Sequence, residues 1–230
     1  MRSNSKKKNI VCVVAHPDDE VLGLGGTLIK HVNSGDKVFI VILSEGEASK
    51  NNKNKKNPYR KDNAKQCSEI MGTSIYRVFD YPDQQLDTIA ILEIIKELEK
   101  IFIKIKPDIA YVHFPWDLNK DHQISSQASF TALRPMSNSN YLTEIRAFET
   151  PSSTDQSPQG GEYLFKPNLY VSIFNEWNDK IKAMKSYNKE LENFPHPRSL
   201  KSIEALSIKR GMESGCKKAE AFMVLRKIWK

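Results

Sequence analysis

The sequence predicts an α/β fold, a Rossmann-like three-layer α/β/α sandwich around a mostly parallel sheet. Short apolar runs rich in β-branched residues, such as residues 10–14, are typical of strands buried on both faces. Segments with apolar residues at helical spacing alternate with them, as at residues 89–101. No internal repeat or linker interrupts the chain, so we expect one domain over residues 1–230, with residues 1–8 as a disordered basic tail.

The first predicted strand, residues 10–14, ends abruptly in polar residues. Residues 15–20 read Ala-His-Pro-Asp-Asp-Glu, and a helical pattern follows. In open α/β sheets, ligands bind at the carboxyl ends of the strands. Because His and Asp are both zinc ligands, His16 and Asp19 are two candidates for a site with three protein ligands. The neighbouring Asp18 is then a candidate general base that takes a proton from water.

The same acidic cluster has a simpler interpretation. Asp residues commonly cap helices, so Asp18 and Asp19 could serve only as caps. Glu20 is interpreted as a carboxylate in the first helical turn, where it meets the positive end of the helix dipole. The metal interpretation therefore needs further ligands from a distant part of the chain.

A second polar loop supplies that partner. Residues 108–113 form a strand-like run, and the loop that follows ends in Asp121 and His122, before a helical stretch at residues 123–133. If both strands are parallel, the two loops lie at the same edge of the sheet.

The two loops together resemble the PIG-L/LmbE family of zinc-dependent de-N-acetylases, which carry the AHPDDE motif found here at residues 15–20 and a later Asp-His pair. Members of that family remove acetyl from N-acetylglucosamine units in glycolipids, sugar nucleotides and thiol precursors. The resemblance implies that His16, Asp19 and His122 bind zinc, with Fe²⁺ as an alternative metal, and that Asp18 is the general base.

One position departs from the family pattern. The usual second motif is HxxDH, and here it reads NKDH, beginning at Asn119. The resemblance assigns the first His to steadying charge on the tetrahedral intermediate, whereas an Asn donates a hydrogen bond but carries no charge. Either Asn119 acts as a neutral donor, or His196 or Arg198, in a stiff segment with two prolines, supplies the charge. Asp121 is predicted to orient the loop or a ligand.

Further residues are candidates for contact with the substrate. In the family an Arg begins the helix predicted here at residues 59–71, and Arg60 is its match, against the alternative of an ordinary surface Arg. Asp83 is the nearest match to an Asp that binds sugar hydroxyls. Trp116 is a candidate for stacking on a pyranose, unless it only packs, and Arg198 is counted with this group as well.

The remaining elements follow from the same patterns. Asp87 is predicted to cap the helix at residues 89–101. Further strands are expected at residues 38–43, 74–79, 145–149, 169–173 and 219–228, and a further helix at residues 177–187. The last helix is expected to begin at Ser199 or Ser202 and to end near Gly211 or Gly215.

The formal net charge of +7 raises the alternative of a nucleic-acid-binding protein. Much of the excess lies in the Lys-rich residues 50–56, which lack apolar periodicity and aromatic residues for stacking on bases, so we expect a solvated loop. The loop could also act as a lid that attracts a phosphate-bearing substrate. A non-catalytic, zinc-containing domain that binds anions remains an alternative.

The sequence therefore predicts a hydrolase that removes acetyl from an N-acetylated amino sugar and releases acetate. The nearer alternative is the same hydrolysis on another acyl amide. No run of residues approaches a membrane span, the polar first eight residues are too short for a signal peptide and no apolar h-region precedes the first strand, and the three cysteines are scattered. We therefore expect a cytoplasmic protein without nucleic-acid partners. A homo-oligomer is compatible with the sequence.

Overall fold

A computed structural model describes residues 7–45, 60–135, 140–158 and 160–229. The predicted Lys-rich loop at residues 50–56 and the first six residues of the predicted basic tail lie outside these ranges.

The described strands form one sheet in the order β3-β2-β1-β4-β5-β7-β6. Their bounds are β1 (Asn9–Val14), β2 (Lys37–Ser44), β3 (Ser74–Tyr81), β4 (Ile109–His113), β5 (Glu144–Phe148), β6 (Leu169–Ser172) and β7 (Ala219–Lys227). Strands β1 to β5 are parallel, and β7 runs antiparallel to both β5 and β6. The predicted mostly parallel sheet is confirmed.

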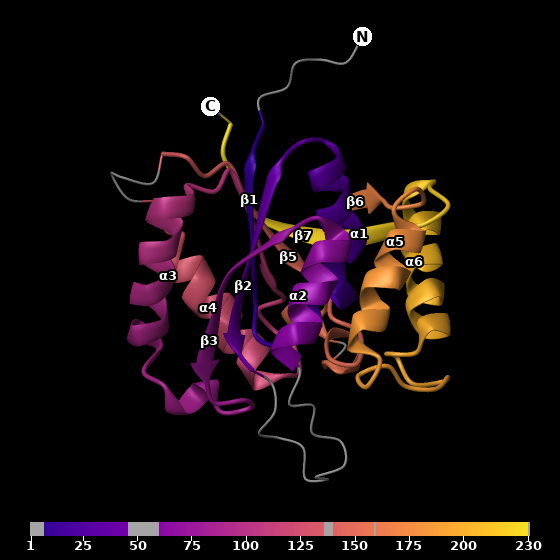
Figure 1. Cartoon of the computed structure of the whole chain (residues 1–230), viewed down its shortest axis with the longest axis horizontal. Helices are drawn as coiled ribbons and strands as arrows, with labels where there is room; N and C mark the ends of the chain where they lie inside the picture. The colour runs from indigo at the N-terminus through magenta and orange to yellow at the C-terminus, as the bar shows by residue number, and fades with distance from the viewer. Residues whose placement is uncertain (1–6, 46–59, 136–139, 159, 230) are drawn as a thin grey trace.

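Helices cover both faces of this sheet. Their bounds are α1 (Asp19–Asn33), α2 (Arg60–Met71), α3 (Ile91–Ile105), α4 (Lys120–Ala132), α5 (Trp177–Met184) and α6 (Leu200–Ser214). Helices α1, α2, α5 and α6 contribute to one apolar cluster, whereas α3 and α4 contribute to the other (Figure 1). This arrangement confirms the predicted α/β/α sandwich. Within the described ranges, every helix is too short or too polar to cross a bilayer.

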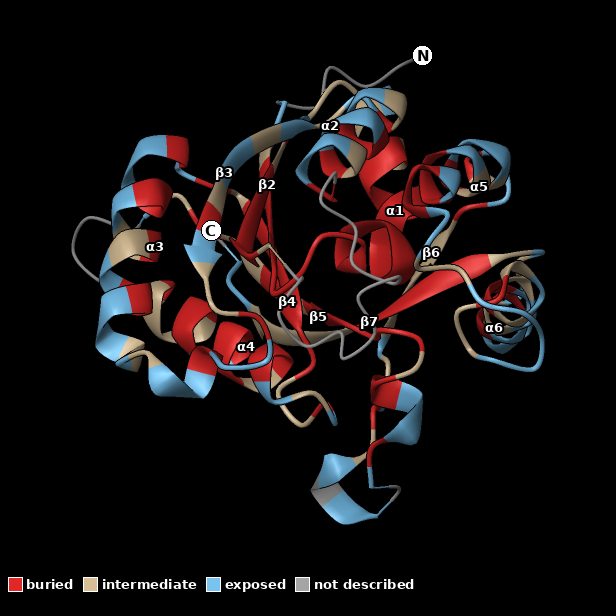
Figure 2. Ribbon diagram, turned by 60° about the horizontal axis from the view of Figure 1, so that its bottom comes forward, coloured by how far each residue is buried: buried red, intermediate tan, exposed pale blue. Residues whose placement is uncertain are grey.

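Strand β1 shows why the central strands read as unbroken apolar runs. Ile10, Cys12 and Val14 pack into the cluster on one face, and Val11 and Val13 pack into the cluster on the other. Alternate side chains of a strand point to opposite faces, so a strand covered on both sides is apolar throughout. The central strands and α1 are mostly buried, while the outer surfaces of α3 and α6 are exposed (Figure 2).

One predicted helix start was wrong. Asp87 does not cap α3, which begins at Ile91 with Ala90 at the N-cap position. Asp87 lies instead in the short 3-10 helix η2 (Leu86–Thr88). The N–H of Leu86 donates to Asp121 Oδ1 at 3.0 Å, which attaches this segment to α4.

Helix α1 is interrupted near its middle, where Leu24 adopts a non-helical conformation (φ −148°). Beyond the break, the N–H groups of Gly26 and Thr27 donate to the carboxylate of Glu220 on β7 at 3.0 and 2.7 Å. Lys180 of α5 donates to the same carboxylate at 2.7 Å and to the carbonyl two residues before the break at 3.0 Å. Lys180 and Glu220 are buried, so an ion pair between distant elements holds the two halves of α1 together.

Candidate metal centre

The order of the strands places a crevice between β1 and β4, where the direction of winding reverses. His16, Asp18 and Asp19 follow β1, and His122 lies in the first turn of α4, which follows β4. The predicted meeting of the two loops at one edge of the sheet is thus found, at the lower edge in Figure 1.

Three side chains at this edge could hold a metal ion. His16, Asp19 and His122 each offer one ligand atom, and these atoms lie within 4.8 Å of one another. Asp19 Oδ2 is 3.4 Å from His16 Nδ1 and 3.3 Å from His122 Nε2. Asp19 Oδ1 is buried and makes no hydrogen bond to the described residues. Because an unpartnered buried carboxylate oxygen is costly, and two His with one carboxylate suit zinc, these residues fit a divalent metal.

The electrostatics of the cluster favour positive charge. Burial alone would lower the pKa of His122, but the carboxylates of Asp19 and Asp117 outweigh it and raise that pKa to about 10. Burial opposes ionisation of Asp19, yet His122 and His113 hold its pKa well below the usual range. The site therefore stabilises a carboxylate together with a nearby cation.

Two further carboxylates fix the other side of the His16 ring. His16 Nε2 lies 3.0 Å from Asp121 Oδ2 and 3.2 Å from Asp83 Oδ1. These three side chains also lie close enough to hold an ion. Asp121, however, already accepts hydrogen bonds from the N–H groups of Gln84 (2.8 Å) and Leu86 (3.0 Å), so we interpret it as the group that orients His16.

Asp117 plays the same part for His122, and the sequence analysis did not select it. Asp117 Oδ1 lies 3.2 Å from His122 Nδ1, leaving Nε2 of that ring to face Asp19. The carboxylate of Asp117 also accepts hydrogen bonds from Ser153 and, at 2.6 Å, from Thr154. The sequence did offer a signal for Asp117, because it is a carboxylate in the same loop as the candidate ligand His122, five residues before it.

His113, at the end of β4, is a second residue that the sequence analysis missed. Its Nε2 accepts a hydrogen bond from the N–H of Ala15 at 3.0 Å, and its ring stacks on His122 with centroids 3.9 Å apart. Burial, with the neighbouring His122, lowers the pKa of His113 to about 4, so the ring is neutral at pH 7. A neutral His113 ring can pack against the candidate ligand His122 without repelling a metal cation.

Asp18 lies beside the cluster in a strained conformation (φ 111°), outside the left-handed helical region that Asp and Asn favour among non-glycine residues. Its Oδ2 accepts hydrogen bonds from Arg60 at 3.1 Å and from Arg198 at 3.2 Å. Its Oδ1 is buried and makes no hydrogen bond within the described ranges. Burial raises the pKa of Asp18 above its usual value, although both arginines oppose this. One oxygen is thus fixed and the other is available for a proton.

Glu20 makes two buried hydrogen bonds that the sequence analysis did not predict. It lies in the first turn of α1, as expected, but it is buried and accepts hydrogen bonds from the N–H of Asp18 at 3.0 Å and the hydroxyl of Tyr187 at 2.7 Å. Burial raises the pKa of Glu20 to about 7, against the effect of the Tyr187 hydrogen bond. Glu20 therefore helps to hold the strained backbone of Asp18.

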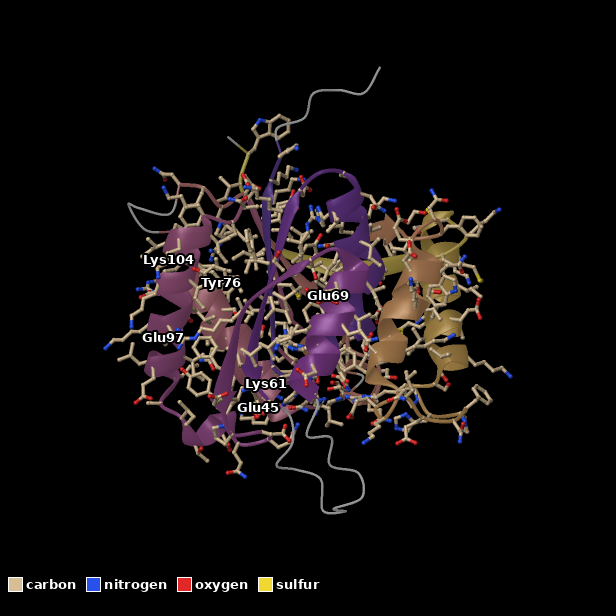
Figure 3. All side chains as sticks on the ribbon, in the orientation of Figure 1. Glu45, Lys61, Glu69, Tyr76, Glu97 and Lys104 are labelled. Atoms are coloured by element: carbon tan, nitrogen blue, oxygen red, sulfur yellow. The ribbon has the colours of Figure 1, made fainter. Side chains whose placement is uncertain are left out.

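Arg60 is not an ordinary surface residue, because it is buried and also donates to the carbonyl of Pro17 at 2.8 Å. The next residue, Lys61, is exposed and pairs with Glu45 and, at 3.0 Å, with Asp80. Lys61 and Glu45 lie close together in Figure 3. The side chain of Arg60 thus faces the site from the first turn of α2.

Of the other predicted site residues, some lie at the candidate metal centre and some lie farther from it. The side-chain oxygen of Asn119 accepts a hydrogen bond from the N–H of Asp121 at 2.9 Å, so it caps α4. Arg198 reaches Asp18, whereas His196 is exposed and accepts a hydrogen bond from the N–H of Arg198 at 3.1 Å. Trp116 lines a hollow along α4 to which none of the three candidate metal ligands contributes.

Known proteins resemble this chain in sequence and in fold. It is 26% identical over 189 residues to a diacetylchitobiose deacetylase of Thermococcus kodakarensis, covering 80% of this chain and 70% of that protein. It is 23% identical over 194 residues to a 4-oxalmesaconate hydratase of Pseudomonas putida, covering 79% and 73%. An N,N'-diacetylchitobiose deacetylase of Pyrococcus horikoshii has a similar fold, with a TM-score of 0.76 at 20% identity over 95% of this chain and 84% of that chain.

The family model described as GlcNAc-PI de-N-acetylase matches residues 11–133, which include both loops of the candidate metal centre. Since this match spans more than half of the chain, the protein belongs to the PIG-L family.

Proposed function

We propose that this protein is a metal-dependent hydrolase that removes the acetyl group from an N-acetylated amino sugar. The observation that carries the proposal is the set of three ligand atoms within 4.8 Å, beside a buried Asp18 with one unpartnered oxygen. The relatives named as diacetylchitobiose deacetylases support a saccharide substrate.

His16, Asp19 and His122 would hold the metal, with Zn²⁺ as the expected ion and Fe²⁺ as the alternative. When bound there, such an ion supplies Lewis acidity, which lowers the pKa of water and polarises the amide carbonyl.

Asp18 is proposed to move the proton. Its Oδ1 accepts a proton from the attacking water while a C–O bond forms at the acetyl carbon. The same proton then passes to the nitrogen as the C–N bond breaks, so the products are acetate and a free amino sugar. Arg60 and Arg198 hold Oδ2, which keeps Oδ1 directed toward the water.

Arg198 is proposed to supply the positive charge that Asn119 lacks. The oxygen of Asn119 is occupied as a helix cap, which leaves only its amide N–H groups as donors. Arg198 contacts the proposed base, and His196 lies one step farther out. The substrate roles of Arg60, Asp83 and Trp116, the cytoplasmic location, a phosphate on the substrate and a homo-oligomer stay predictions.

The test is release of free amine, detected with fluorescamine, from N-acetylglucosamine, its glycosides and its UDP conjugate. We expect release by the zinc-loaded protein, loss after chelation and recovery on adding the metal back. Metal bound without release from any substrate would contradict the proposal. It would direct attention to another acyl amide or to hydratase chemistry, which the name of one relative suggests.

Replacing Asp117 with Asn is expected to weaken metal binding about 10- to 100-fold, because groups that orient a ligand affect affinity to this extent. The hydrogen bond to His122 would then come from a neutral amide that can present the wrong group to the ring. Competition with a chromophoric chelator measures the affinity. Asp179→Asn, at an exposed position on α5, is the matched control, and equal affinity in the two folded variants would contradict the assignment.

A further inference from the structure

A second cavity, of about 290 Å³, lies toward the opposite edge of the sheet from the candidate metal centre. Its walls come from the second half of α1, from residues just before β1 and β2, and from β5 and β6. The start of β1 is at the top in Figure 1, whereas the loops of the metal centre are at the bottom. The volume is near the lower end of the range for ligand pockets, about 300–1,000 Å³. None of the residues proposed to act in hydrolysis lines this cavity.

Most of the charged side chains that line the cavity are cations. Lys8, Lys30 and Arg146 each carry a positive charge, and Asp36 is the one carboxylate among the described lining residues. That carboxylate already has partners. Its Oδ1 accepts a hydrogen bond from the N–H of Lys8 at 2.9 Å, and its Oδ2 lies 2.7 Å from His31 Nδ1.

Ion pairs beyond the cavity leave part of the positive charge uncompensated. Arg146 pairs with Glu144, but Glu144 also pairs with Lys227 at 3.2 Å. Lys30 pairs with Glu176 at 3.3 Å, although its side chain is 41% exposed. Two carboxylates therefore face three cations in these pairs, so the wall keeps an excess of positive charge.

The ring of His31 is held in this positive surrounding. Burial lowers its pKa, Asp36 opposes that effect, and the charges of Arg146 and Lys8 lower the pKa further. Because a carboxylate only accepts, Nδ1 of the neutral ring donates to Asp36 and Nε2 accepts from the hydroxyl of Tyr111 at 2.9 Å. Arg146 Nη1 donates to the same hydroxyl at 2.8 Å, so the guanidinium is fixed at the wall.

The end of α1 does not reverse the preference for negative charge. The carboxyl end of a helix is its negative pole and favours cations. Here, however, the carbonyls of residues 30–32 already accept hydrogen bonds from the N–H groups of residues 34–36. These carbonyls are therefore poorly placed to act as ligands for a cation.

Thr27 is the residue that points most directly to a ligand. It lines the cavity and is 1% exposed, and its Oγ1 is buried without a hydrogen bond to any residue that the structure describes. Its backbone N–H is satisfied, because it donates to Glu220 at 2.7 Å. Leaving a buried hydroxyl unpaired is unfavourable, whereas an acceptor oxygen in the cavity would receive its proton.

This set of groups selects one class of ligand. Ammonium and guanidinium groups only donate hydrogen bonds, so an apolar molecule would leave them unpaired and a metal cation would be repelled. A phosphate offers several acceptor oxygens and negative charge, and it matches the fork of an Arg. Val171 is the one lining side chain without a polar group in the described ranges, and it leaves room for a small organic part.

We propose that this cavity binds a phosphate group, either free phosphate or the phosphate of a small metabolite, at a site separate from the metal centre. Thr27, Lys30 and Arg146 are its binding residues. The site does not depend on the reaction that the metal centre catalyses.

The experiment is calorimetric titration of inorganic phosphate and of glucose 6-phosphate into the zinc-loaded protein, with glucose and KCl of equal ionic strength as controls. Thr27→Val should weaken phosphate binding about tenfold or more, the effect of one lost hydrogen bond to a charged group, whereas Thr27→Ser keeps the hydroxyl and the affinity. Lys30→Met should weaken binding about threefold. Thr131→Val on α4 and Lys182→Met on α5, both outside the cavity, are the matched controls.

Tighter binding of glucose 6-phosphate would assign the site to a phosphorylated metabolite, and tighter binding of inorganic phosphate would assign it to the free ion. Phosphate bound at the metal centre instead would be lost on chelation and unaffected by Thr27→Val, which would overturn the proposal. Equal affinity for phosphate in folded Thr27→Val and unmodified protein, or equal binding of glucose, would also overturn it.

Stability provides an independent measurement. Without phosphate, Thr27→Val should not lower the free energy of unfolding, because its hydroxyl has no partner to lose among the described residues. Phosphate should raise the Tm of the unmodified protein and raise that of Thr27→Val less, since a ligand stabilises the state that binds it. A marked loss of stability in phosphate-free Thr27→Val protein would show that the hydroxyl serves the fold, against the proposal.

Discussion

Replacing Asp18 with Asn is expected to lower kcat for amine release by about 10²- to 10⁴-fold, the range that general base catalysis contributes. The Asn side chain has nearly the same shape, so the variant keeps the backbone strain at φ 111° close to that of the unmodified protein. Its amide cannot take a proton from water. Fluorescamine assays give the rate, while metal analysis and thermal unfolding show that the site and the fold are retained.

The matched control for that variant is Asp62→Asn, at an exposed position two residues after Arg60 on α2. It should leave kcat unchanged, because Asp62 lies outside the contacts described around Asp18. A folded Asp18→Asn protein that keeps its metal and most of its kcat would show that another group takes the proton.

The second large effect is expected on stability. Lys180→Met should lower the free energy of unfolding by about 3–5 kcal/mol, the cost of removing one partner from a buried ion pair. The variant leaves the buried Glu220 carboxylate without its cation and the carbonyl of Leu22 without its donor. Urea denaturation at constant pH measures the change.

Lys30→Met provides the comparison. Lys30 pairs with Glu176 at 3.3 Å, but its side chain is 41% exposed, so its loss should cost no more than about 1 kcal/mol. If Lys180→Met cost no more than Lys30→Met, the buried pair would not be what holds the broken helix together.

Most of the strands and helices could be predicted from local patterns in the sequence. The strands could be predicted because they are buried on both faces, as β1 is, and each therefore reads as an unbroken apolar run. Local signals narrowed the ends of α6 to two residues each: of the candidate starts Ser199 and Ser202, Ser199 is the cap, and of the candidate ends Gly211 and Gly215, Gly215 ends the helix with φ 71°. The start of α3 was missed because Asp87, which has the residue type of a cap, lies in η2, and η2 is held by the contact of Leu86 with Asp121 on α4, 35 residues away in the sequence.

Only part of the candidate site could be predicted from the sequence, because several of its contacts join residues that lie far apart in the chain. The AHPDDE motif places several groups within six residues, so the first loop could be recognised from its local pattern. His113 looked like the ordinary end of a buried strand, and its contact with Ala15 spans 98 residues. The stiff segment with two prolines indicated that His196 or Arg198 reaches the site, but the partner of Arg198, Asp18, lies 180 residues away in the sequence, and no local pattern identifies it. Only the folded sheet brings such pairs together.

The interruption in α1 also bears on the order in which the protein matures. Gly26 and Glu220 are separated by 194 residues, so the second half of this helix obtains its cap only when β7 joins the sheet. Contacts of such separation form late, because the entropy of closing the intervening chain must first be overcome. On a ribosome, Gly26 is made 194 residues before Glu220, so the AHPDDE loop is synthesised long before its supporting helix can be completed. Synthesis of His16 and Asp19 and assembly of the candidate metal centre are therefore widely separated in time.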